Sequence, residues 1–188
     1  MNASLPVRQE IAVPASIVRG DSASGSMLEV CSVRVGPTVF GIPIEHIVEI
    51  IGGVRPRPVP LAPDFVGGLI HYRGDILTTV SLRRLLYVDG IQCTDGRQDI
   101  VVLEGPGGCF GLQVDSVGQV LTVSSADHEP NPSILDGHRR ALFAGAYKLT
   151  DGLLIMLDSA RLDPDLLSPA LIRSERVDSG PAIGLLKS

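Results

Sequence analysis

Histidine and cysteine are the residue types best suited to hold a metal or attack a substrate, and their spacing in this sequence favours neither role. The four histidines form no His-x-x-x-His or His-x-His pair, and the three cysteines form no Cys-x-x-Cys pair. Zinc sites are typically built on such spacings, and disulfide frameworks on an even number of cysteines. The sequence also lacks a Gly-x-Ser-x-Gly turn and a Walker motif. We therefore predict no catalytic residue, no metal and no cofactor, and we do not expect an enzyme.

The charged residues that stand out are Glu49 and Arg73, because the chain contains an internal repeat that carries them in one copy only. Glu49 corresponds to Gln119 in the second copy, and Arg73-Gly74 corresponds to Thr150-Asp151. An arginine guanidinium can hold a carboxylate through two parallel hydrogen bonds. Two interpretations remain open: Arg73 only caps a surface hairpin, or it pairs with Glu49 within salt-bridge range and the pair shapes a partner-binding surface.

Apolar side chains close to these charges are candidates for the rest of such a surface. Protein association is driven largely by burying apolar area, so a binding surface must leave some of it exposed in the free protein. Glycines beside it would allow a partner backbone to approach closely. Besides Glu49, Arg73 and Gly74, the predicted partner-binding residues are Ile47, Ile50, Phe65, Val66, Gly68, Val117 and Val120.

The internal repeat predicts the strands on which these residues lie. Residues 39–51 align without gaps on 109–121, and residues 68–80 align on 145–157. Both copies consist of short β-branched runs separated by Gly, Pro and Asp, which is typical of small barrels and not of alternating α/β units. The sequence therefore predicts an all-β protein with few short helices, built as two five-stranded β-barrels related by a pseudo-two-fold axis.

The same reading divides the chain into three parts. Residues 1–26 are expected to form a flexible leader, 27–165 the folded domain, and 166–188 a tail. Within the domain, the first barrel is placed at about 27–87 and the second at about 99–165, and an exchange of strands between them is left open. The two barrels should share one core, since a barrel of about 60 residues is only marginally stable alone. The predicted core residues are Val33, Val35, Phe40, Ile42, Ile70, Val80, Val101, Leu103, Phe110, Leu112, Val114 and Ile155.

Charge and composition exclude several classes of partner. The chain has 21 acidic and 16 basic residues, a formal charge of −5 and no Trp. Nucleic-acid binding needs a basic surface and aromatic side chains for stacking, so no nucleic-acid partner is expected. No uncharged stretch approaches the roughly 20 residues that span a membrane, and the first residues do not resemble a signal peptide. We expect a cytoplasmic protein with no direct membrane insertion.

Four ordered blocks of this sequence resemble the CheW-like family. They are Phe40–Ile50, Ala62–Ile76, Val114–Val120 and Leu153–Asp158. The resemblance covers most of the chain, from about residue 27 to 163. It implies that the two barrels are intertwined around a shared hydrophobic core.

The resemblance also implies a function and a site. It implies a non-catalytic bacterial adaptor in chemotaxis signal transduction, which joins the regulatory domain of a CheA-type histidine kinase to the cytoplasmic tip of chemoreceptors. Such receptors would recruit the protein to the inner face of the membrane. In the family an acidic residue and an Arg-Gly pair are matched here by Glu49 and by Arg73-Gly74, and the family pairs these charges.

This sequence departs from the family pattern beside that pair. His71-Tyr72 precede Arg73 where the family usually has Asn-Leu, and Ser81 begins a segment that typically starts with Asp. An alternative within the same fold is a scaffold for another kinase pathway, such as surface motility or biofilm control. An enzyme or a ligand-binding barrel would need convergent polar residues in a pocket, and the sequence offers only scattered ones.

Overall fold

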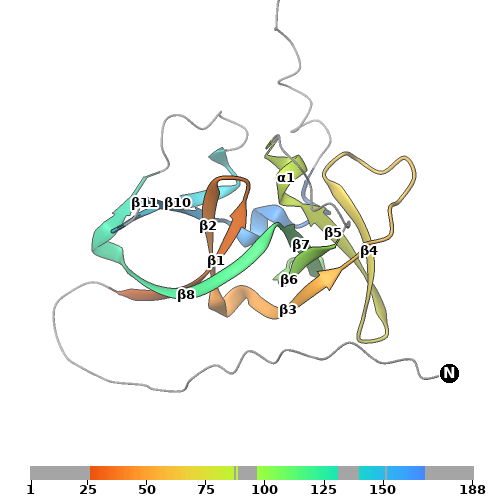
Figure 1. Ribbon diagram of the computed structural model, residues 1–188, viewed down its shortest axis with the longest axis horizontal. Helices are drawn as coiled ribbons and strands as arrows, with labels where there is room; N and C mark the ends of the chain where they lie inside the picture. The colour runs from red at the N-terminus through yellow and green to blue at the C-terminus, as the bar shows by residue number, and fades with distance from the viewer. Residues whose placement is uncertain (1–25, 87, 89–96, 131–139, 151, 168–188) are drawn as a thin grey trace, which may run out of the picture.

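The computed structural model describes residues 26–86, 88, 97–130, 140–150 and 152–167, and Figure 1 shows their arrangement. The predicted leader, apart from Ser26, and the tail from residue 168 onward lie outside the described residues. The strands are β1 (Met27–Val35), β2 (Thr38–Pro43), β3 (Ile47–Val54), β4 (Val66–Tyr72), β5 (Asp75–Ser81), β6 (Gln98–Gly105), β7 (Gly108–Val114), β8 (Ser116–Ser124), β9 (His128–Glu129), β10 (Phe143–Leu149) and β11 (Gly152–Leu157). The helices that lie wholly within the described residues are α1 (Leu82–Leu85) and three 3₁₀ turns, η1 (Ile44–His46), η2 (Ser125–Asp127) and η3 (Ser159–Leu162).

The strands form two sheets, and each sheet takes strands from both copies of the repeat. The first has the order β8-β1-β2-β11-β10-β9 and the second the order β3-β6-β7-β5-β4. We call the barrels that these sheets form barrel A and barrel B; they lie side by side in Figure 1. Barrel A has one strand more than the five expected, because the two-residue β9 pairs with β10. The intertwined all-β fold expected from the sequence is confirmed.

Corresponding strands make corresponding pairs in the two barrels. In barrel A, β1 is antiparallel to both β2 and β8, and β2 is parallel to β11. In barrel B, β6 is antiparallel to both β7 and β3, and β7 is parallel to β5. Each barrel therefore combines the first two strands of one copy with the later strands of the other, which number four in barrel A and three in barrel B. This exchange gives the molecule its pseudo-two-fold symmetry.

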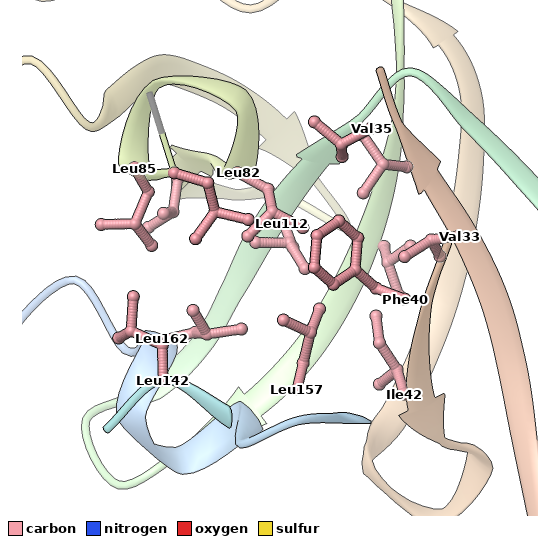
Figure 2. Packing of buried hydrophobic residues seen from close by; sticks show 14 of the residues in the cluster. Val33, Val35, Phe40, Ile42, Leu82, Leu85, Leu112, Leu142, Leu157 and Leu162 are labelled. Atoms are coloured by element: carbon pink, nitrogen blue, oxygen red, sulfur yellow. The ribbon is translucent and has the colours of Figure 1, made fainter. Parts of the chain in front are cut away.

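One hydrophobic core joins the two barrels (Figure 2). It contains Val33, Val35, Phe40 and Ile42 from β1 and β2, and Val101, Leu103, Phe110 and Leu112 from β6 and β7, all at most 3% exposed. Leu82 and Leu85 of α1 and Leu162 of η3 close it from the ends of the barrels. Of the twelve predicted core residues, Ile155 alone is only partly buried, and Ile70 belongs to a different cluster.

Alternate residues along the same strands point into the barrels themselves. Barrel A encloses a cluster of Val30, Val123, Tyr147, Leu154 and Met156, and barrel B encloses Ile70, Leu77, Ile100 and Val102. Because successive side chains of a strand face opposite sides, each strand contributes one set of residues to the shared core and another to its own barrel.

A half-buried ion pair, Arg83 with Asp115, links the two copies of the repeat. The Arg83 side chain, on α1, donates to both carboxylate oxygens of Asp115, which lies between β7 and β8. The same carboxylate accepts a hydrogen bond from the backbone N–H of Gly36, in the β1–β2 turn, at 2.7 Å. Three segments far apart in sequence thus meet at one side chain, which fixes α1 against both barrels.

Candidate partner-binding site

Glu49 and Arg73 form the ion pair that their asymmetry predicts. Glu49 lies on β3 and Arg73 in the β4–β5 turn, and Arg73 Nη2 is 2.7 Å from Glu49 Oε2. The Arg73 side chain is 66% exposed and that of Glu49 is 31% exposed. A pair with this much solvent contact is worth about 0–1 kcal/mol to folding. The charges can therefore be changed without unfolding the protein, as a binding surface requires.

Tyr72 is a third member of this cluster. Its hydroxyl donates to the same Glu49 Oε2 at 3.0 Å, and the Arg73 guanidinium lies 5.0 Å from the centre of its ring. Burial and the hydrogen bond to Glu49 raise the pKa of Tyr72 above its usual value. The phenol therefore stays protonated as a donor at neutral pH. Sequence reasoning noted Tyr72 only as a departure from a family pattern and gave it no role.

The turn that carries Arg73 is a tight hairpin. Tyr72 pairs with Asp75, which leaves Arg73 and Gly74 as the two connecting residues. Their φ angles are +51° and +96°, as in the type I′ turns that favour Asn-Gly in two-residue hairpins. Arginine is disfavoured in this left-handed region by roughly 1–2 kcal/mol per residue. The hairpin therefore carries this unfavourable backbone free energy at Arg73, whose exposed side chain points to Glu49.

The predicted apolar residues divide into three groups. Ile47, Ile50, Val66 and Val117 are half-buried and pack partly against the shared core, whereas Val120 is 57% exposed. The expectation that Phe65 is exposed is wrong. Phe65 is 3% exposed and belongs to the shared core, because its carbonyl oxygen accepts the Ser81 N–H at 2.8 Å and so holds it against β5.

Gly68 is also buried, and a contact within this chain explains why it is glycine. Its φ is +132°, and a Cβ on it would lie 2.5 Å from the Arg57 carbonyl oxygen. Arg57 and Leu69 exchange two backbone hydrogen bonds of 2.8 Å there. The close approach expected of a partner backbone at Gly68 is thus made by the β3–β4 connection itself.

Two exposed apolar side chains that sequence reasoning missed lie on the elements that carry the ion pair. Val48, next to Glu49 on β3, is 41% exposed, and Ile76, on β5 just after the turn, is 63% exposed. A surface that combines exposed aliphatic groups with an ion pair suits a protein partner. Simple alternation could not place Val48, because the register of β3 shifts between Ile47 and Glu49.

The described residues contain no group of three or more His, Cys, Asp or Glu side chains placed to hold a metal ion. None of their helices is long and apolar enough to cross a membrane. Fold and site together define a double β-barrel protein whose most distinctive surface feature, in this part of the chain, is a charged hairpin beside exposed aliphatic residues.

Comparisons with known proteins identify the class more closely. The family model of the CheW-like domain matches residues 29–165. The chain is 31% identical over 130 residues to a chemotaxis protein CheW of Rhizobium meliloti, an alignment that covers 69% of this chain and 83% of the relative. The chain therefore belongs to the CheW-like family.

Two further matches help to place it. The crystal structure of the scaffolding protein TtCheW from Thermoanaerobacter tengcongensis superposes with a TM-score of 0.65, covers 73% of this chain and 92% of that chain, and is 24% identical. At that identity the likeness concerns the fold. Protein FrzA of Myxococcus xanthus is 34% identical over 53 residues, which covers 28% of this chain and 33% of FrzA.

Proposed function

We propose that this protein is a non-catalytic adaptor of chemotaxis signal transduction, coupling chemoreceptors to a CheA-type histidine kinase. The observation that carries the proposal is the family match over residues 29–165 together with the Glu49–Arg73 pair. Relatives named as chemotaxis proteins align over about two thirds of the chain or more.

The two partners would use two related faces. Ile47 and Ile50 on β3 of barrel B correspond to Val117 and Val120 on β8 of barrel A. The barrel B face adds Glu49, Arg73 and Gly74, whereas the corresponding residues of the other copy carry no ion pair. Two similar but unequal faces give one surface for the kinase regulatory domain and another for the receptor tip. Phe65 and Gly68 support the barrel B face from beneath, and Val66 borders it.

The ion pair would act in recognition more than in folding. Charges at an interface set specificity and association rate, and an unmatched charge against a partner costs several kcal/mol. Reversing Arg73 places a carboxylate beside Glu49 and inverts the sign that a partner meets. Because the Arg73 side chain is 66% exposed, the fold should tolerate the change.

Titration against both partners tests the proposal. The kinase regulatory domain and a receptor-tip peptide are titrated with wild type, Arg73→Glu, Val117→Asp and the control Arg161→Glu. Arg161 is matched to Arg73, since its side chain is also 66% exposed and it lies 3.9 Å from a carboxylate, that of Asp158. We expect Arg73→Glu to weaken one interaction at least tenfold, Val117→Asp to weaken the other, and Arg161→Glu to change neither. Failure of the wild type to bind either partner would refute the adaptor function.

A scaffold for another kinase pathway is the second candidate. The match to FrzA supports it, although over a much shorter stretch than the chemotaxis relatives. Binding to the kinase encoded nearest to this gene distinguishes the two candidates. A chemotaxis adaptor should bind the regulatory domain of that kinase and chemoreceptors at the same time.

The proposal includes a location. An adaptor of this kind is cytoplasmic and is recruited to the inner face of the membrane by receptors. A fluorescent fusion should therefore cluster at the membrane only in cells that contain the receptors, and Arg73→Glu or Val117→Asp should disperse it.

A further inference from the structure

The two barrels end differently at one equivalent position. Pro43 closes β2 in barrel A, and Gln113 occupies the corresponding place on β7 in barrel B. The pairing confirms the correspondence, since Pro43 lies opposite Val30 and Gln113 opposite Ile100. Both Val30 and Ile100 are fully buried inside their barrels.

In barrel B the glutamine side chain fills the end of the barrel. Gln113 is 4% exposed, and its Nε2 donates to the Thr79 hydroxyl oxygen at 2.6 Å. The Thr79 hydroxyl in turn donates to the Gly68 carbonyl oxygen at 2.7 Å. Gly67 makes room for the amide, since a Cβ there would collide with it. An amide on a short apolar stem thus closes barrel B.

In barrel A all three of these residues are different. Pro43 replaces Gln113, Met156 replaces Thr79 and Ala144 replaces Gly67, so the side chain that closes barrel B has no counterpart. A cavity of about 260 Å³ lies at this end. Its buried floor includes Tyr147, Met156 and Leu157, and its remaining lining residues are Leu28, Pro43, His46, His128, Ala144, Asp158 and Ser159.

We propose that this open end of barrel A is a binding site for a small neutral molecule with a carboxamide or similar amide head and a short apolar body. The occupant would take the place that the Gln113 side chain holds in barrel B. The cavity is slightly smaller than the roughly 300–1,000 Å³ of pockets for drug-sized ligands, which suits a compact ligand. The inference goes beyond the adaptor function and does not rest on it.

The polar groups at the cavity suit an uncharged head. His46 Nδ1 lies 2.7 Å from the Ser159 hydroxyl oxygen, which fixes the imidazole at the rim. The His128 ring packs edge-on against Tyr147 at 5.2 Å between centroids. The imidazole nitrogens and the Ser159 hydroxyl are groups that can hydrogen-bond to an amide. A carboxylate ligand would meet the negative charge of Asp158, which lines the same cavity.

Methionine methyl NMR on the full chain tests the site. Met156 is in the cavity floor and 3% exposed, whereas Met27, on β1, is 65% exposed and not among the lining residues. The probe is butanamide, which reproduces the glutamine side chain together with its Cα, with butanoate and butylamine as charged matches. We expect a saturable shift of the Met156 methyl with half-saturation at about 1–10 mM butanamide, weaker responses to the other two, and no shift of Met27.

Two variants establish where the probe binds. Pro43→Gln/Ala144→Gly introduces two of the three barrel B residues into barrel A and keeps Met156 as the reporter. The introduced glutamine should occupy the cavity, so the butanamide shift should disappear. Ala144→Phe fills the rim from an exposed position and should also abolish it, even if the double variant folds poorly. No saturable Met156 shift in the wild type, or an equal shift in Ala144→Phe, would overturn the site. Tighter binding of butanoate or butylamine would overturn the ligand class.

Discussion

Barrel A and barrel B share their strand pairing and differ in their polar residues. Their strands pair in the same order and direction, and their interiors are filled by corresponding residues such as Tyr147 and Ile70, or Leu154 and Leu77. The ion pair of Glu49 with Arg73 exists only in barrel B, where the other copy has Gln119 and Thr150.

The difference shows which residues the fold itself demands. Apolar positions are duplicated because each barrel and the shared core must exclude water in the same way. The polar residues at the hairpin and at the barrel end occur in barrel B and are not duplicated in barrel A. Barrel A forms without them, so the fold does not require them. Asymmetry between the copies is therefore the most direct pointer to function in this molecule.

Separating the copies should have the largest effect. Chain termination after Leu86 leaves β1 and β2 without β8 and β11, and β3 without β6, so we expect an unfolded or aggregating fragment. Coexpression of the fragments 1–94 and 95–188 should restore a folded complex. Amide chemical-shift dispersion measures both results. A dispersed spectrum of the first fragment alone would show that the copies fold independently.

Equivalent core truncations should cost similar amounts. Ile42 and Leu112 correspond in the repeat, and both are fully buried in the shared core. Ile42→Ala and Leu112→Ala should each lower the free energy of unfolding by about 2–5 kcal/mol, as measured by urea denaturation. Ile76→Ala, at a 63% exposed position, should change it by no more than about 0.5 kcal/mol. A large loss in only one core variant would contradict the equivalence of the two positions.

Two substitutions of Arg73 in the β4–β5 turn should show how much its left-handed backbone conformation affects stability. Arg73→Asn and Arg73→Val both remove the ion pair, but only asparagine accepts a positive φ readily. We expect the valine variant to be less stable than the asparagine variant by about 1–2 kcal/mol, as measured by thermal unfolding. Equal stabilities would mean that the turn relaxes out of the left-handed region. Binding at the barrel B face should be weakened in both.

The smallest effect concerns the Tyr72 hydroxyl. Tyr72→Phe removes its hydrogen bond to Glu49 and should lower the free energy of unfolding by about 0.5–1.5 kcal/mol at neutral pH. The pKa of Tyr72 is raised in the folded protein, so this contribution is complete below the unfolded value near 10. It is lost as pH rises through the higher folded value.

Unfolding measurements at neutral pH and above pH 10 check this prediction. The difference between wild type and Tyr72→Phe should shrink as pH rises through the folded pKa of Tyr72. A constant difference across that range would contradict the raised pKa.

Sequence patterns predicted the core and the ion pair well because both leave a signature in the chain. Repetition marked the shared core well but missed residues inside the barrels, such as Val30, Ile100 and Leu154. The failure of repetition marked Glu49 and Arg73. Phe65 was misplaced since an apolar residue beside glycines can face either the core or the solvent. Neither the role of Tyr72 nor the Arg83–Asp115 pair could be read from spacing, because both depend on contacts between segments that the repeat does not align.

The exchange of strands also determines how the molecule can transmit a signal. Rotating one barrel against the other would strain the chain crossings between the two sheets and open the core that joins them. Partners held on the two barrels are therefore kept at one separation and one angle. The protein behaves as a rigid spacer between the two partners. A movement of one partner therefore reaches the other as a displacement of the whole protein.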